Sequence, residues 1–262
     1  MPEITSIHNP KIQHLRALMQ KRSLREQEHL FVVEGVRLAE EALLHGPQPV
    51  EVYYASSISD RAKDLLSRFV QNGAQATEVA DDVVHRLSET ESSQGVVLVM
   101  PITARPLSMD LNFVLILDQI KDPGNAGTML RTAAACGVQL VITTPGTTDL
   151  YAPKVVRAGM GAHFRLALLE QSWDQVLVLC REREKPVKLL TTSADAGQTI
   201  WQADFRQPVA LIIGSEAEGV SADARRHADG AIRIPMPGNF ESLNAAVAAG
   251  ILLFEVVHQR MP

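Results

Sequence analysis

The sequence predicts an α/β protein in two parts, the larger of which contains a mostly parallel sheet covered by helices. Short apolar runs of strand length alternate with longer segments whose apolar residues recur at helical spacing. A stretch of low periodicity with two prolines, PITARPLS, separates the parts. We therefore expect a first domain at residues 1–102, a linker at 103–109 and a second domain at 110–262.

The first domain is expected to alternate helices with short strands. Helical spacing of apolar residues indicates helices at residues 10–23, 35–45 and 60–72. Runs rich in β-branched and aromatic residues indicate the strands LFVVEG, VEVYYAS and GVVLVM. These elements predict a small α/β domain.

The second domain begins with an apolar strand, FVLILD, at residues 113–118. Helices are then expected at NAGTMLRTAAACG and SWDQVLVLCRERE, followed by a long last helix after Ser242, and strands at VQLVITT, VKLLTTS and VALIIG. Strands that alternate with helices form parallel sheets covered on both faces. Ligands of such sheets bind beyond the carboxyl ends of the strands, so a site is expected there.

Composition excludes several classes of protein. The net charge of −5 argues against a general binder of nucleic acid. Cys136 and Cys180 lie in apolar helical patterns, which favours packed thiols and a reduced, cytoplasmic setting. The amino terminus has no apolar signal region, and no apolar run is long enough to cross a membrane. The histidines have no metal-binding spacing, so no metal is expected.

One local stretch is strongly basic despite the negative net charge. The run KIQHLRALMQKRSLR, residues 11–25, contains no acidic residue and carries an apolar helical stripe. Such a run is either a solvated helix face or a surface that contacts RNA phosphates. The candidate RNA-binding residues are Lys11, Arg16, Lys21, Arg22 and Arg25.

Polar groups follow two of the predicted strands. After FVLILD, Pro123 and Gly124 break the chain, and Asn125 is placed to cap a helix that carries Arg131. Arg131 alone has an ordinary alternative, that of a surface arginine. After VALIIG, the stretch GSEAEG lacks the spacing of a dinucleotide or phosphate loop. Its glycines allow a ligand to approach the backbone, and its acids suit a cationic ligand.

The third polar stretch, IPMPGNFESLNAAVAAGI, joins a tight turn to an alanine-rich helix. Its polar residues Ser242 and Asn244 have two interpretations: an ordinary helix cap, or a ligand pocket made largely of backbone. The small residues that follow favour close packing of the helix, either within the domain or against a second subunit.

In order and separation, these stretches resemble the motifs of the SpoU (TrmH) family of RNA ribose methyltransferases. The first motif reads Asn125-Ala126-Gly127 with Arg131, the second Gly214-Ser215-Glu216-Ala217-Glu218-Gly219, and the third Ile234-Pro235-Met236 with Ser242-Leu243-Asn244. The amino-terminal part resembles the substrate-binding domain of this family, related to RNA-binding ribosomal proteins, at NPKIQHLRAL and FVVEGVRLAEEAL.

The resemblance implies S-adenosylmethionine as methyl donor, a ribose 2′-hydroxyl as acceptor, a homodimer and a deep trefoil knot near the carboxyl terminus. RNA is the implied partner, with ribosomal RNA favoured over transfer RNA by the additional amino-terminal domain. The cofactor contacts it implies are Thr143, Gly214, Glu216, Ile234, Met236, Leu243 and Asn244, and the implied catalytic residues are Arg131, Asn125, Glu216, Ser242 and Asn244.

The sequence departs from the family at Gly159, where the family commonly has a serine; nearby Arg157 is a further candidate for RNA contact. A guanidinium stays protonated, so we expect Arg131 to orient the acceptor and stabilise developing negative charge. Three alternatives stay open: a transfer-RNA methyltransferase, a non-catalytic RNA-binding ribosome-assembly factor, and an unrelated nucleotide-binding enzyme.

Overall fold

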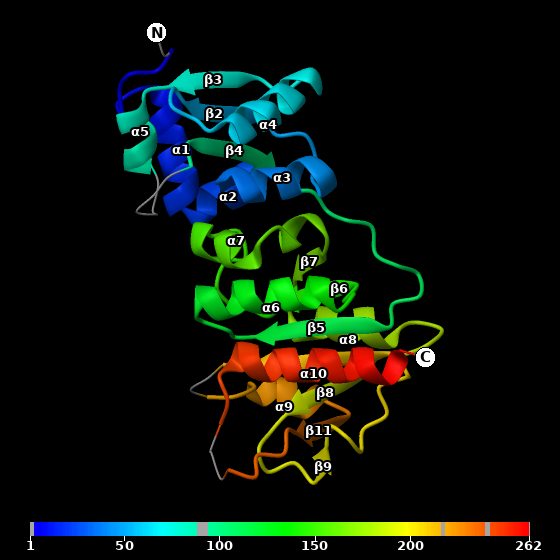
Figure 1. Ribbon diagram of the computed structural model, residues 1–262. Helices are drawn as coiled ribbons and strands as arrows, with labels where there is room; N and C mark the ends of the chain where they lie inside the picture. The colour runs from blue at the N-terminus through cyan, green and yellow to red at the C-terminus, as the bar shows by residue number, and fades with distance from the viewer. Residues whose placement is uncertain (1–2, 88–93, 216–217, 239–241, 262) are drawn as a thin grey trace. The chain divides into compact units, whose positions relative to one another are not determined.

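The computed structural model describes residues 3–87, 94–215, 218–238 and 242–261 (Figure 1). The chain divides into two compact units. The first comprises the chain up to Thr103 together with Asp149–Arg165, and the second comprises Ala104–Thr148 and the chain from Leu166 onward. Both units are mixed α/β structures, as the sequence predicts. None of the described helices is both long and apolar enough to span a lipid bilayer.

The sheet of the first unit has four strands in the order β1-β4-β2-β3. The pairs of β4 with β1 and with β2 are antiparallel, whereas β2 and β3 are parallel. The sequence analysis did not predict β3, a four-residue edge strand with two adjacent polar residues and no clear polar–apolar alternation. The strands are β1 (Leu30–Glu34), β2 (Glu51–Ala55), β3 (Ala76–Val79) and β4 (Val96–Pro101).

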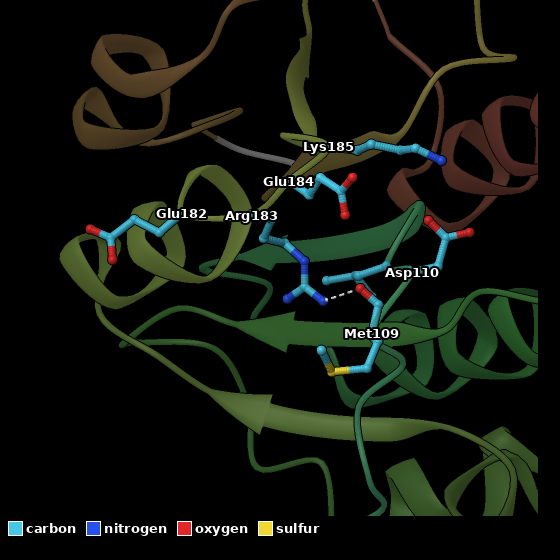
Figure 2. Close-up of a pocket in the computed structure, with 7 residues that line it drawn as sticks. Met109, Asp110, Glu182, Arg183, Glu184 and Lys185 are labelled. Atoms are coloured by element: carbon cyan, nitrogen blue, oxygen red, sulfur yellow. Dashed lines mark hydrogen bonds between the residues drawn. The ribbon is translucent and has the colours of Figure 1, made fainter.

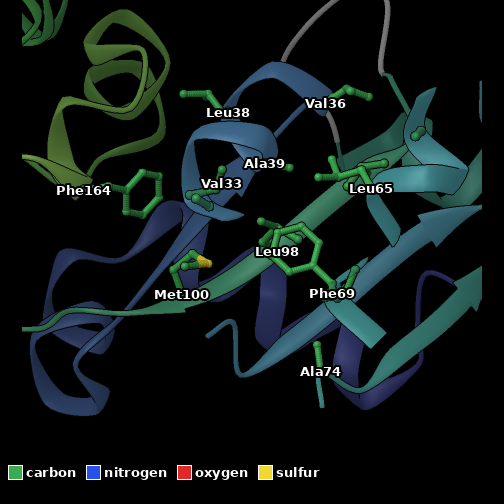
Figure 3. Close-up of a cluster of buried hydrophobic side chains, with 14 of the residues drawn as sticks. Val33, Val36, Leu38, Ala39, Leu65, Phe69, Ala74, Leu98, Met100 and Phe164 are labelled. Atoms are coloured by element: carbon green, nitrogen blue, oxygen red, sulfur yellow. The ribbon is translucent and has the colours of Figure 1, made fainter. Parts of the chain in front are cut away.

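Helices cover both faces of this sheet. One apolar cluster packs α3 and α4 against the face that includes Phe31 and Leu98, and the other packs α1 and α5 against the face that includes Tyr53. Figure 3 shows the first cluster, with Phe69 and Leu98 close together. The helices are α1 (Pro10–Gln20), α2 (Arg22–Glu28), α3 (Val36–His45), α4 (Asp60–Gln71) and α5 (Asp81–Leu87).

The helix expected at residues 10–23 is two helices, because Lys21 adopts an extended conformation that ends α1. The break turns Arg25 of α2 inward, where its side chain is 4% exposed. Its guanidinium donates to the backbone carbonyls of Leu18 and Met19 and pairs with Asp149. This finding corrects the expectation that Arg25 belongs to an exposed RNA-binding surface. The acidic partner of Arg25 is Asp149, which is far away in the sequence.

The segment Asp149–Arg165 completes the core of the first unit. It forms α7 (Pro153–Gly159) and a short 3₁₀ helix (Ala162–Phe164). Val156 and Phe164 belong to the same apolar cluster as Phe31. This packing has no periodic signal in the sequence, because each of the two helices is too short to show a repeat.

The sheet of the second unit has seven strands in the order β7-β6-β5-β10-β8-β11-β9, and all its pairings are parallel. This confirms the predicted parallel sheet. The sequence analysis missed β7, β9 and β11, which have four residues or fewer. The strands are β5 (Phe113–Asp118), β6 (Leu140–Thr143), β7 (Ala167–Glu170), β8 (Lys188–Thr192), β9 (Gln198–Thr199), β10 (Val209–Gly214) and β11 (Gly230–Arg233).

Two pairs of helices enclose this sheet. Helices α8 and α9 pack against the face that includes Ile116 and Ile212. Since successive strand residues point to opposite faces, Leu115 and Leu211 face the other side, where α6 and α10 pack together. The helices are α6 (Pro123–Ala135), α8 (Trp173–Arg181), α9 (Ala222–His227) and α10 (Ala245–Arg260).

Candidate active site

The three polar motifs follow strands β5, β10 and β11 at their carboxyl ends. Because the strands are parallel, these ends lie at one edge of the sheet. Strand β10 lies directly beside β5, and β8 alone separates it from β11. The order of the strands therefore gathers three stretches that are spread over more than a hundred residues of sequence.

The first motif differs in one detail from its predicted structure. Helix α6 is capped by Asp122, whose carboxylate accepts a hydrogen bond from the backbone N–H of Asn125 at 2.7 Å. Asn125 therefore lies within the first turn and does not cap the helix as expected, because the helix begins at Pro123. The amide of Asn125 is thereby available to contact another element.

That contact joins the first motif to the third. The side-chain amide of Asn244 donates to the side-chain oxygen of Asn125 at 3.1 Å. The oxygen of Asn244 also accepts from the backbone N–H groups of Ala246 and Val247, at 2.9 and 3.2 Å, and so caps α10. Asn244 thus caps a helix and also connects two motifs, while the ligand pocket stays a prediction.

Arg131 lies on α6, about two turns from the start of the helix. Its side chain is exposed. Within the part of the chain that the structure describes, it forms no hydrogen bond or ion pair, so its donors are free to bind a substrate oxygen. The role of Arg131 toward the acceptor stays a prediction.

The two described ends of the glycine loop (residues 214–219), Gly214–Ser215 and Glu218–Gly219, lie against each other. Ser215 and Gly219 exchange two backbone hydrogen bonds, each 2.9 Å long. A Cβ atom at Gly214 would lie 2.1 Å from the carbonyl carbon of Gly219 and 2.3 Å from the nitrogen of Val220. Gly214 is thus required by the approach of the chain to itself, which is a different reason from the expected approach of a ligand. Glu216 lies outside the described residues.

The third motif follows β11. Ile234, Pro235 and Met236 are partly buried after the end of that strand. Leu243 is also partly buried, whereas Ser242 is exposed, directly before the cap of α10. These residues follow the carboxyl end of β11, at the same edge of the sheet where β10 ends with Gly214.

Thr143 lies at the same edge of the sheet, at the carboxyl end of β6. It is buried at the end of β6, where its hydroxyl donates to the carbonyl of Leu169 at 3.5 Å. Strand β5 separates β6 from β10. A neighbour of β10 on its other side, β8, presents a different threonine pair at its carboxyl end.

The end of β8 supplies residues that the sequence analysis missed. Thr191, Thr192 and the two residues that follow line a cavity of about 550 Å³ together with Gly219 and Arg225. The strand itself was predicted from VKLLTTS. Its place between β10 and β11 was not, because sequence periodicity carries no information about which strands are neighbours.

The predicted RNA-binding residues differ in their accessibility. Lys11 and Lys21 are exposed, and Arg16 is partly buried. Arg22 pairs with Glu26 on the next turn at 2.6 Å. In the segment Asp149–Arg165, Arg157 is partly buried.

A larger cavity, of about 600 Å³, lies away from these motifs (Figure 2). It is lined by residues 109–111, which precede β5, and by residues 182–185, which follow α8. Arg183 donates to the carbonyls of Ser108 and Met109 at 2.8 and 2.9 Å, which fastens the connecting segment to the end of α8. No motif residue lines this cavity, so we assign it no part in the site.

Comparison with known protein families gives a match to each part of the chain. A model described as the SpoU rRNA methylase family matches residues 112–254. A model described as the MRM3-like substrate-binding domain matches residues 9–98. Together the two matches extend over most of the chain.

Similar proteins include a 23S rRNA (guanosine(2553)-2′-O)-methyltransferase of Bacillus subtilis, 30% identical over 98% of this chain and 99% of that protein. An uncharacterized tRNA/rRNA methyltransferase of Synechocystis is 33% identical over 98% of this chain and 94% of its own length. Among solved structures, the SpoU methyltransferase AviRb of Streptomyces viridochromogenes, in complex with AdoMet (S-adenosylmethionine), has a TM-score of 0.88 at 30% identity. The likeness covers 97% of this chain and 98% of that one.

Proposed function

Because the chain belongs to the SpoU rRNA methylase family, we propose that it transfers a methyl group from S-adenosylmethionine to a ribose 2′-hydroxyl of ribosomal RNA. The observation that carries this proposal is the contact between Asn125 and Asn244. It places the helix that bears Arg131 beside the segment that follows the glycine loop and β11. The contact therefore supports a single site that contains both Arg131, which acts on the acceptor, and the candidate cofactor residues.

The residues at the sheet edge suit S-adenosylmethionine. The cavity beside β8 offers threonine hydroxyls and small residues, which leave room for a nucleoside and provide hydrogen-bonding groups for it. When bound, S-adenosylmethionine supplies an electrophilic methyl group. The residues that we propose to hold it are Thr143, Gly214, Glu216, Ile234, Met236, Leu243 and Asn244, joined by Thr191 and Thr192.

Arg131 has the catalytic role in this proposal. A ribose hydroxyl is a weak nucleophile that must lose its proton as the new bond forms. The guanidinium remains protonated, so Arg131 donates hydrogen bonds to the acceptor oxygen or its neighbouring phosphate and stabilises the developing negative charge. Asn125, held by Asn244, positions the start of the same helix. Ser242 and Glu216 complete the proposed catalytic group.

The first unit is proposed to bind RNA. Residues 1–102 form the proposed substrate-binding domain, connected by residues 103–109 to the methyltransferase domain at 110–262. The match of residues 9–98 to a substrate-binding domain supports this role, as do the exposed Lys11 and Lys21. Arg16, Arg22 and Arg157 remain candidates for further phosphate contacts.

A homodimer through α10 is also part of the proposal. Val247, Ile251 and Phe254 are 52%, 37% and 55% exposed and recur at intervals of four and three residues, which places them on one face of the helix. An exposed apolar face of this kind indicates contact with another protein surface. A second copy of the chain is the proposed occupant. The deep trefoil knot and a cytoplasmic location, where the ribosomal RNA of bacteria is found, stay predictions.

The proposed activity is tested by incubating the purified protein with isotopically labelled S-adenosylmethionine and either ribosomal or transfer RNA. Digestion of the RNA to nucleosides and mass spectrometry then identify the methylated position. We expect a ribose 2′-O-methyl nucleoside from ribosomal RNA. Label found only in transfer RNA supports the alternative that the protein is a transfer-RNA methyltransferase. Binding of RNA without S-adenosylmethionine binding or methyl transfer supports a non-catalytic assembly factor.

A further inference from the structure

We propose that Asp118 is a positioning residue that holds the exit of the glycine loop, from Gly219 to Ser221, in place for cofactor binding. The inference rests on the proposed function of that loop. Asp118 is the last residue of β5 and is fully buried, although carboxylates are rarely buried without strong partners. It lies outside the three motifs from which the site was predicted.

The carboxylate of Asp118 accepts hydrogen bonds from two segments that are distant in the sequence. One oxygen accepts from the backbone N–H of Ser221 at 2.6 Å. The other accepts from the hydroxyl of Thr144 at 2.9 Å and from the hydroxyl of Ser221 at 3.3 Å. Asp118 thus connects the ends of β5 and β6 to the chain that leaves the glycine loop.

Ser221 is the point at which this connection reaches the loop. It lies two residues after Gly219, whose carbonyl group packs against Gly214. Its hydroxyl also accepts from the backbone N–H of Ala224 and caps α9. The loop is therefore closed by the Ser215–Gly219 pair and fastened at its exit by Asp118. Asp118 thus adds a buried carboxylate to the contacts that the loop exit makes with Ser215 and with α9.

This arrangement predicts a separation between cofactor affinity and the chemical step. Asp118 contacts the exit of the glycine loop but none of the first-motif residues Asn125 and Arg131. Arg131 is positioned independently, by a helix that Asp122 caps and that Asn244 contacts through Asn125. A looser glycine loop should therefore lower affinity for the cofactor while the rate at saturating cofactor changes much less.

The first test is Asp118→Asn in the full chain. An amide keeps the shape of the side chain but replaces charge-assisted hydrogen bonds by weaker neutral ones. We expect the Kd for S-adenosylmethionine, measured by calorimetry, to rise about tenfold, and the KM for the cofactor to rise with it. The kcat at saturating cofactor should stay within about threefold of the wild-type value.

A matched pair of threonine variants separates positioning from general stability. Thr144→Val removes the hydroxyl that contacts Asp118, whereas Thr147→Val removes a buried hydroxyl that donates to the carbonyl of Leu117 at 2.9 Å. Both should lower the urea midpoint of unfolding. Only Thr144→Val should weaken cofactor binding, and it provides the test if Asp118→Asn fails to fold.

The inference is wrong if Asp118→Asn or Thr144→Val binds S-adenosylmethionine with the wild-type Kd. It is equally wrong if Thr147→Val loses as much affinity as Thr144→Val, since the effect then follows stability alone. Failure of the proposed function gives a different result, because the wild-type protein itself would then bind no S-adenosylmethionine.

Discussion

At the residue scale, two of the arginines that the sequence presents as candidate site residues, Arg131 and Arg25, differ in their surroundings. Arg131 is exposed on α6, whereas Arg25 is buried and paired with Asp149. Their different surroundings separate a group that is free to bind a substrate from one that holds the fold together. The sequence alone shows both as arginines on predicted helices.

Replacement of Arg131 by alanine should slow methyl transfer without weakening cofactor binding. Loss of one preorganised donor for developing negative charge costs about 3–4 kcal/mol, or roughly 100- to 1000-fold in rate. Alanine favours the helix, so the fold should persist. Single-turnover transfer to RNA and titration with S-adenosylmethionine measure the two effects on the same protein.

Arg206→Ala provides the control, because Arg206 is an exposed arginine that precedes the amino end of β10. It should transfer methyl groups at the wild-type rate. A normal rate in Arg131→Ala would remove Arg131 from the mechanism. Loss of cofactor binding in that variant would instead assign Arg131 to the cofactor.

His163 should make the stability of the protein depend on pH. Burial lowers the pKa of its imidazole to about 4, and one ring nitrogen lies 2.7 Å from the carbonyl oxygen of Leu150. The unfolded chain takes up a proton near pH 6.5, but the folded chain does not until about pH 4. The contribution to the free energy of unfolding is therefore complete above pH 6.5 and is lost as the pH falls toward 4.

Urea unfolding of the wild type and of His163→Phe at pH 7 and pH 5 measures this contribution. Since one pKa unit corresponds to about 1.4 kcal/mol, the wild type should lose about 2 kcal/mol more than the variant between these two values. An equal loss in both proteins would show that other groups cause the acid sensitivity.

At the scale of elements, helix ends connect the fold to the site. Asn244 caps α10 and contacts Asn125 on α6. Ser172 caps α8 by a capping box with Gln175, and no motif residue contacts it. The two caps use the same chemistry, but only one of them lies in the proposed site.

This difference predicts the effects of two alanine substitutions. Asn244→Ala and Ser172→Ala should each lower the free energy of unfolding by about 1 kcal/mol, through loss of a helix cap. Asn244→Ala should also weaken S-adenosylmethionine binding, because it releases the contact between the first and third motifs. Calorimetric titration and urea unfolding of both variants test this; equal cofactor affinities would limit Asn244 to a capping role.

At the scale of the whole molecule, the chain does not fold as two consecutive pieces. The segment Asp149–Arg165 comes from between β6 and β7, yet it completes the core of the first unit. Two ion pairs connect this segment to the rest of the first unit. The side chains of Arg25 and Asp149 are 5% and 15% exposed, and those of Arg165 and Glu41 are 45% and 27% exposed. Because the two pairs differ in exposure, we expect them to contribute differently to the free energy of unfolding.

Asp149→Asn should destabilise the protein far more than Glu41→Gln. Breaking a buried pair leaves an uncompensated charge and costs about 3 kcal/mol or more, whereas an exposed pair contributes about 0–1 kcal/mol. Urea unfolding of the two single variants provides the comparison. Similar midpoints for both would mean that solvent reaches Arg25 and that the segment is held by its apolar contacts alone.

The homodimer is the second prediction at this scale. Phe254→Glu places a charge in the exposed apolar face of α10 and should convert the protein to a monomer in sedimentation at micromolar concentration. Leu44→Glu, at an equally exposed apolar residue of α3, should leave the dimer intact. A wild-type protein that sediments as a monomer contradicts the dimer itself.

The sequence by itself determined the alternation of strands and helices and the motif residues Asn125, Arg131 and Asn244, together with the family they indicate. These features are local, because periodicity and the order of motifs can be read directly from the linear sequence. It also predicted both apolar central strands of the larger sheet, β5 and β10, because complete burial gives each an unbroken apolar run.

Only the tertiary structure decided which of these elements are neighbours. It placed β8 between β10 and β11, and so brought Thr191 and Thr192 to the cavity that Gly219 and Arg225 also line. It also paired Arg25 with Asp149, 124 residues away. Strand order and ion pairing of this kind depend on how whole layers pack, and the free energy of that packing is not contained in any short window of sequence.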